Sequence, residues 1–128
     1  MFQILSICVG ASAGALARWG LGLWLNTGGP LVWGTLAANL VGGFLVGLCV
    51  AVFNAVPQLD PAWRLALITG FLGALTTFSS FSAEVVGLLQ QQRYAWAGCV
   101  ATLHLLGSLL LTALGMQVAQ WGLARAAL

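Results

Sequence analysis

The sequence has very little charge. Only 5% of its 128 residues are Asp, Glu, Lys or Arg, whereas roughly 25% is usual in a soluble domain. Lysine is absent, 61% of the residues are hydrophobic, and the mean hydropathy is +1.03. The net charge of +2 is too small for a nucleic-acid-binding surface. These proportions exclude a soluble domain and a nucleic-acid partner, and they predict an integral protein of the lipid bilayer.

The sequence also lacks the residue clusters that catalysis and metal binding require. Its three cysteines, Cys8, Cys49 and Cys99, are far apart and each lies inside an apolar run, which argues against a disulfide framework or a metal site. One His, one Asp and one Glu give no converging nucleophile–base pair. We therefore do not expect an enzyme, and we expect the cysteines to act as small apolar residues in helix packing.

Signal-peptide features are missing as well. The opening MFQILSICVG has no positive charge, and the apolar run that follows is longer than the core of a signal peptide. We therefore expect residues 1–128 to form a single membrane domain.

The apolar runs predict an all-α fold with four transmembrane helices. A helix needs about 20 apolar residues to cross a bilayer, and the three prolines fall in the short breaks between the runs, where a missing N–H is harmless. The predicted spans are approximately 4–25, 31–56, 62–90 and 94–124.

The four arginines predict no fixed orientation in the membrane. Arg64 and Arg125 lie on the side of the N-terminus, and Arg93 and Arg18 on the other. Because the positive-inside rule then gives two arginines to each side, we hypothesise dual topology and an antiparallel homodimer.

Two pairs of glycines indicate close helix packing. Gly10 and Gly14 form one GxxxG pair, and Gly43 and Gly47 form another. Such pairs let helix backbones approach each other. The pattern leaves open whether they pack within one subunit or between two.

Polar residues lie in rows along the predicted helices, where a bilayer makes them costly. Arg18 shares a face with Gly10 and Gly14, and could attract anions in a vestibule or extend to the membrane surface. Asn39 is deep in the second span, either in a packing hydrogen bond or facing a ligand. His104 and Ser108 begin a stripe in the fourth span that continues to Thr112, and the role of His104 stays open between lining, packing and pH sensing.

Residues 70–84, GFLGALTTFSSFSAE, predict a break in the third helix. Clustered Gly, Thr and Ser loosen a helix, and non-helical backbone survives in a membrane only where protein or a cavity covers it. We expect a break near the middle of the span, with free carbonyls able to bind a cation. Phe78 and Phe81 share a face, and their electropositive ring edges could face an anion or pack in a core.

These residues together resemble the Fluc (CrcB) fluoride channels. The motifs GALARW (14–19), GTLAANLVGGFLVG (34–47) and GFLGALTTFSSFSAE (70–84) match the family in order, and the third is highly specific. The resemblance implies a dual-topology antiparallel homodimer in the bacterial inner membrane, with two fluoride pores and a broken third helix. It further implies passive, selective fluoride export that protects against fluoride toxicity.

The resemblance also assigns roles to individual residues. It implies a structural sodium ion at the dimer centre, held by the backbone carbonyls of Gly73 and Thr76. It places Arg18 in the aqueous vestibule and Glu84 near a pore end. The implied anion pathway consists of Asn39, Phe78, Phe81, Ser108, Thr77 and Ser80.

Two other classes of protein fit the sequence less well. A small multidrug transporter needs a carboxylate in the first helix, and this one has none. A subunit without transport activity would explain the GxxxG pairs but not the aligned rows of polar residues.

Overall fold

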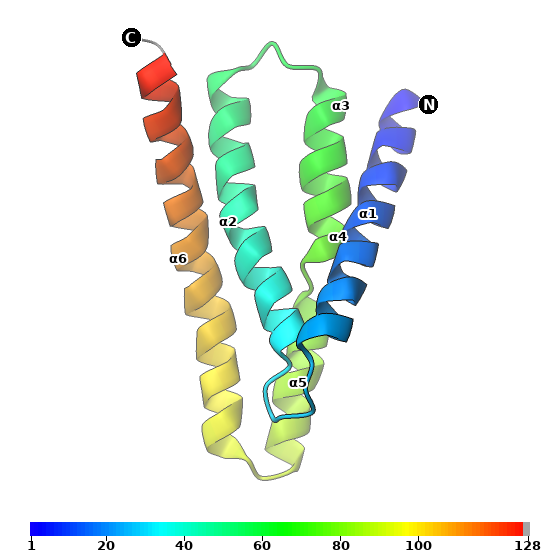
Figure 1. Cartoon of the computed structure of the whole chain (residues 1–128), viewed down its shortest axis with the longest axis vertical. Coiled ribbons are helices and arrows are strands. Elements are labelled where there is room, and N and C mark those ends of the chain that lie inside the picture. Colours follow the sequence, from blue (N-terminus) through cyan, green and yellow to red (C-terminus); the bar gives the residue numbers. More distant parts are fainter. Residues whose placement is uncertain (127–128) are drawn as a thin grey trace.

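The computed structural model describes residues 1–126, and these residues are helical apart from short connections (Figure 1). The third span is divided into four segments, whereas each of the others is one helix. The elements in chain order are α1 (Phe2–Leu25), α2 (Trp33–Ala55), α3 (Pro61–Arg64), the π-helix η1 (Leu65–Leu72), α4 (Gly73–Leu75), α5 (Phe78–Gln90) and α6 (Tyr94–Ala126).

Within residues 1–126, four helical stretches are long and apolar enough to cross a membrane, which confirms the predicted number of spans. Their observed bounds agree with the predicted ones to within two residues. They are Phe2–Leu25, Trp33–Ala55, Pro61–Gln90 and Tyr94–Ala126.

The third span begins with a regular helix cap. Asp60 Oδ1 accepts a hydrogen bond of 2.8 Å from the N–H of Ala62, and Pro61 occupies the first helical turn. An acidic N-cap followed by proline is the usual signature of a helix start, because proline has no N–H to leave unpaired there. The cap fixes the point at which the chain leaves the loop after α2 and enters the third span.

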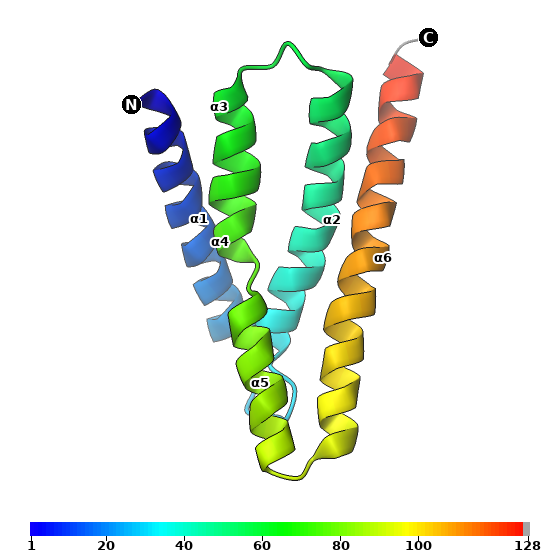
Figure 2. The same ribbon diagram turned by 180° about the vertical axis from the view of Figure 1, so that it is seen from behind.

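The spans alternate in direction through the bundle. The N-terminus, the connection from α2 to α3 and the end of α6 lie at one end, and the other two connections lie at the opposite end (Figure 1). Figure 2 shows α5 in front and the extended piece of chain that separates it from α4. This arrangement matches the two sides used above to count the arginines.

Both GxxxG pairs pack inside this single chain. A side-chain carbon on Gly10 or Gly14 would overlap the carbonyl oxygens of Ala66 and Phe71 in η1, respectively. A side-chain carbon on Gly47 would overlap the carbonyl oxygen of Thr112 in α6. The alternative left open by the sequence is therefore decided: these glycines bring α1 against η1 and α2 against α6.

One of the three cysteines packs between helices as the sequence predicts, since Cys49 contacts the core around Ala38 and Leu75, and the prediction is wrong for the other two. Cys8 and Cys99 are exposed, Cys49 is half-buried, and all three thiols are free. Cys8 and Cys99 therefore lie on the outer surface of the bundle rather than in its helix contacts. An apolar thiol is tolerated there because a lipid-facing surface needs no polar group.

Candidate functional site

The third helix is interrupted at Thr76 and Thr77, which confirms the predicted break. Thr76 has φ −81° and ψ 154°, and Thr77 has φ −151° and ψ 115°, so both residues are extended. The Thr77 hydroxyl accepts a hydrogen bond of 3.1 Å from the N–H of Ser80 and thereby caps α5. The Thr76 hydroxyl donates to the carbonyl of Leu72 at 2.9 Å. The clustered hydroxyls thus end one helix and start the next.

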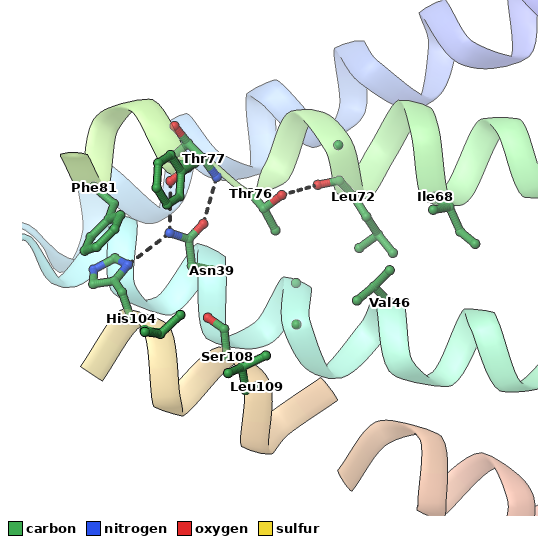
Figure 3. Close-up of a pocket in the computed structure, with 15 residues that line it drawn as sticks. Asn39, Val46, Ile68, Leu72, Thr76, Thr77, Phe81, His104, Ser108 and Leu109 are labelled. Atoms are coloured by element: carbon green, nitrogen blue, oxygen red, sulfur yellow. Dashed lines mark hydrogen bonds between the residues drawn. The ribbon is translucent and has the colours of Figure 1, made fainter. Parts of the chain in front are cut away.

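Asn39 of α2 binds the extended backbone directly (Figure 3). Its Oδ1 accepts from the Thr77 N–H at 2.7 Å, and its Nδ2 donates to the Thr77 carbonyl at 3.0 Å. Nδ2 also lies 3.0 Å from Nδ1 of His104. Asn39 therefore makes the packing hydrogen bonds that the sequence left as one of two alternatives. Its place in an anion pathway stays a prediction, since an anion would have to compete for N–H groups that are already bonded.

The break redirects two backbone N–H groups that would otherwise continue the helix. In an unbroken helix, the N–H of residue i+4 donates to the carbonyl of residue i. Here the Thr77 N–H donates to Asn39 instead of Gly73, and the Ser80 N–H donates to the Thr77 hydroxyl instead of Thr76. The carbonyl oxygens of Gly73 and Thr76 are therefore released from their usual helical donors.

Arg18 of α1 also reaches the break. Its Nε donates to the carbonyl of Ala74 at 3.0 Å, across the contact between α1 and α4. A cation at the C-terminal end of a helix is favourable because the unpaired carbonyls there carry partial negative charge. The arginine is therefore directed into the bundle, and its side chain is half-buried.

A cavity of about 440 Å³ lies beside the break, between the third span, α2 and α6. Among residues 1–126, none of those lining it is charged. It brings together most of the predicted pathway residues with the two sodium-site residues. These are Asn39, Phe78, Phe81, Ser108, Thr77, Gly73 and Thr76.

The aromatic residues of this cavity contact one another in a row. The rings of Phe78 and Phe81 meet edge to face, with centroids 5.4 Å apart and planes at 65°. Phe81 also stacks on His104, with centroids 4.7 Å apart. Phe78 is 78% exposed, so its ring lies at the open side of the cavity. The two phenylalanines share a face, as their spacing predicted.

A second cavity, of about 510 Å³, lies on the α1 side of the break. Arg18, Ser80 and Thr35 contribute to its lining, and Thr77 lines both cavities. The structure thus divides the predicted pathway residues into two groups, with Ser80 apart from the phenylalanines. Thr35 lies one helical turn before Asn39 on the same face, as the first member of the polar row that spacing predicts for the second span. The sequence assigned it no role in the pathway.

Glu84 lies in α5, about two helical turns beyond the break. Its Oε2 is buried and has no hydrogen-bond partner within residues 1–126. It lines neither cavity. Its expected position near a pore end stays a prediction.

The polar stripe of α6 serves three different purposes. His104 bonds Asn39, Ser108 lines the larger cavity, and the Thr112 hydroxyl donates to the carbonyl of Gly43 at 3.0 Å. A hydroxyl between two membrane helices commonly makes such a bond. Of this stripe, Ser108 therefore contributes the hydroxyl at the cavity, while Thr112 fastens α6 to α2.

The side chains of residues 1–126 include no group of three or more His, Cys, Asp or Glu that comes together. Side-chain coordination of a transition metal is thus not offered by the described part of the chain. Backbone oxygens are the available ligands, and hard cations prefer oxygen.

Comparison with known proteins places these features in a family. Residues 5–116 match the family model described as "CrcB-like protein, Camphor Resistance (CrcB)". A protein of Albidiferax ferrireducens named "Fluoride-specific ion channel FluC" is 71% identical over 119 residues, which cover 93% of this chain and 92% of the relative. Proteins of the same name from Variovorax paradoxus and Paracidovorax citrulli are 63% and 58% identical, and cover 94% and 98% of this chain and 96% and 99% of their own lengths.

Proposed function

Because this chain belongs to the CrcB family, we propose that it is a fluoride-selective ion channel that exports fluoride passively from the cytoplasm and so protects the cell against fluoride toxicity. The observation that carries the proposal is the 71% identity, over 93% of the chain, with a protein named as a fluoride-specific channel. The four apolar helices make it a multi-pass membrane protein. Its relatives are bacterial proteins, which supports a location in the bacterial inner membrane.

The two cavities beside the break support a path made of neutral donors. Fluoride is small and strongly hydrated, so a selective path must replace its water with close donors and still release the ion. Hydroxyl groups, an amide and aromatic ring edges provide such donors without a full charge that would trap the anion. We assign the path to Asn39, Phe78, Phe81 and Ser108 in the larger cavity and to Thr77 and Ser80 in the second.

Charged residues lie away from the larger cavity. We assign Arg18 to the aqueous vestibule, because it contributes a positive charge to the second cavity, where it would raise the local concentration of anions. We place Glu84 near a pore end, beyond the hydroxyl groups of α5. The path between these two residues contains only neutral groups in this assignment.

We further propose a structural sodium ion at the break. The carbonyl oxygens of Gly73 and Thr76 fit such an ion, because their helical donors are redirected to Asn39 and to the Thr77 hydroxyl and because hard cations prefer oxygen ligands. When bound, the ion would supply a fixed positive charge at that position. Two carbonyls are too few to coordinate a cation alone, which supports a site shared by two copies of the chain.

A homodimer is supported by the exposure of the break. Gly73, Phe78 and Ser79, which flank the break, are exposed in the single chain, and the extended residues Thr76 and Thr77 are only half-buried. Non-helical backbone within a membrane must be covered by protein or by a water-filled cavity. A second copy would provide that cover. The equal division of arginines between the two ends supports an antiparallel, dual-topology arrangement.

The proposal is tested by fluoride efflux from liposomes that contain the purified protein. A fluoride electrode records release after a potassium ionophore is added, and a parallel experiment with chloride measures selectivity. We expect rapid fluoride release and no chloride release. Fluoride retention by liposomes that contain folded protein would refute the channel, and equal release of both anions would refute its selectivity.

A further inference from the structure

The hydrogen bonds around Asn39 fix the orientation of its amide. The backbone N–H of Thr77 can only donate, so the Asn39 atom 2.7 Å from it must be the oxygen. Nδ2 therefore faces the Thr77 carbonyl at 3.0 Å and Nδ1 of His104 at 3.0 Å. Both hydrogens of the amide are used, one toward the third span and one toward α6.

This orientation determines the state of His104. An amide NH₂ group only donates, so Nδ1 of His104 must accept, and the proton of the neutral ring must lie on Nε2. Nε2 is buried and has no hydrogen-bond partner within residues 1–126, so the bond to Asn39 is the one that fixes this ring. The ring is 4% exposed and stacks on Phe81. It lines the larger cavity, whose lining within residues 1–126 includes no carboxylate that would favour a charged ring. His104 is thus presented to Asn39 as a buried, neutral acceptor.

The consequence reaches the third span through Asn39. The amide lies between two elements, and it keeps the Thr77 N–H away from the carbonyl of Gly73 only while its oxygen faces Thr77. Without an acceptor on α6, one amide hydrogen would be left unpaired inside the bundle, and the side chain would turn toward other acceptors. Figure 3 shows His104 of α6, Asn39 of α2 and Thr77 at the break, joined in that order by hydrogen bonds.

We propose that His104 is a positioning residue: as the neutral Nε2–H tautomer it accepts a hydrogen bond from Asn39, holds that amide against the backbone of Thr77, and so keeps the helix broken and the carbonyl of Gly73 free. This role goes beyond fluoride conduction, because it concerns what maintains the break whatever ion passes. It also assigns a role to a histidine that the sequence left open between lining, packing and pH sensing.

The tautomer is tested by nitrogen NMR on the full chain in lipid bilayers. His104 is the chain's sole histidine, so ¹⁵N-histidine labelling reports on it alone. We expect an unprotonated Nδ1 and a protonated Nε2. We expect Asn39→Ala to remove this preference and give a mixture of tautomers. A proton on Nδ1 in the unmodified chain, or the same single tautomer in Asn39→Ala, would overturn the proposal.

The positioning role is tested by hydrogen exchange at the Thr77 amide. We expect His104→Phe, which keeps a ring but removes the acceptor, to speed this exchange roughly tenfold, as a hydrogen bond weakened by about 1.4 kcal/mol would. His104→Gln supplies an amide oxygen as acceptor and should return the rate close to that of the unmodified chain. An unchanged Thr77 rate in a folded His104→Phe protein would overturn the role.

Thr112→Val is the matched control for these variants. It removes another hydrogen bond between α6 and α2, the 3.0 Å bond to Gly43, at a site remote from Asn39. We expect it to leave both the Thr77 exchange rate and the histidine spectrum unchanged. If Thr112→Val speeds Thr77 exchange as much as His104→Phe does, then any loss of contact between α6 and α2 has this effect, and the proposal is overturned. If His104→Phe does not fold, the histidine spectra of the unmodified chain and of Asn39→Ala decide. Fluoride efflux, measured separately, tests the proposed function without affecting these readouts.

Discussion

The third and fourth spans contain the same kinds of polar residue in apolar surroundings, yet one is broken and the other is not. The third span, Pro61–Gln90, changes from a π-helix to a short α-helix and then to extended backbone at Thr76 and Thr77. The fourth, α6, is a continuous helix of 33 residues that includes His104, Ser108 and Thr112. Hydroxyl groups in a membrane helix are therefore not sufficient to break it.

The spacing of the polar residues and their partners explain the difference. In α6 the stripe residues His104, Ser108 and Thr112 are a turn apart. The hydroxyls of Thr102 and Thr112 bond existing carbonyls, those of Gly98 at 2.8 Å and Gly43 at 3.0 Å. Such bonds leave the backbone ladder intact. In the third span two threonines are adjacent, and Asn39 competes for both backbone groups of Thr77. A helix breaks where a neighbouring element offers its backbone better partners.

The largest effect should come from replacing an aromatic residue of the broken span. We expect Phe78→Ile to reduce fluoride efflux to the level of protein-free liposomes, because the substitution removes an electropositive ring edge from the larger cavity. Leu109→Ile, which changes the α6 wall of the same cavity, should leave efflux nearly unchanged. If the two variants conduct equally, the broken span has no special part in conduction.

A smaller effect is expected at the contact that supports the broken span. We expect Gly14→Ala to destabilise the protein by about 1–3 kcal/mol, because the new methyl group would overlap the backbone of Phe71. Gly20→Ala is the control, since nothing lies within 4 Å of its added carbon. Unfolding in mixed micelles measures both variants. Equal stability of the two would show that α1 does not pack against η1 as described.

The smallest expected effect is the difference in stability between losing a hydroxyl at the break and losing one inside a regular helix. We expect Thr77→Val to cost about 1 kcal/mol, since Ser80 loses its N-cap acceptor. Thr102→Val removes an exposed hydroxyl that bonds only its own helix, and it should change stability by less than about 0.5 kcal/mol. The same unfolding experiment compares them, and a larger cost for Thr102→Val would reverse the distinction.

The sequence was sufficient to predict the four spans and the interruption of the third. Long apolar runs and clustered Gly, Thr and Ser are local signals, and the structure confirms both. The larger cavity also gathers Phe78, Phe81, Asn39 and Ser108 as a group. Helical spacing placed Phe78 and Phe81 on one face and put Asn39 and Ser108 in the polar rows of their own helices. The grouping of the four residues in one path was implied by the family resemblance.

The remaining features depend on contacts between residues far apart in the chain. Asn39 is 38 residues from Thr77 and 65 from His104, and Arg18 is 56 from Ala74. Spacing within one helix carries no information about such partners. It also could not decide whether the GxxxG pairs pack within a subunit, and no sequence pattern marked the π-helix at Leu65–Leu72. A π-helix forms only where the neighbouring helices leave room for its wider turn.

The most direct test of the account is the backbone conformation of four hydroxyl residues in lipid bilayers. Residue-specific ¹³C chemical shifts of Thr76, Thr77, Ser108 and Thr112 would be measured by solid-state NMR on the full chain. The account predicts extended-backbone shifts at Thr76 and Thr77 and helical shifts at Ser108 and Thr112. Helical shifts at all four would return the carbonyls of Gly73 and Thr76 to helical hydrogen bonds and contradict the broken span on which the proposed path depends.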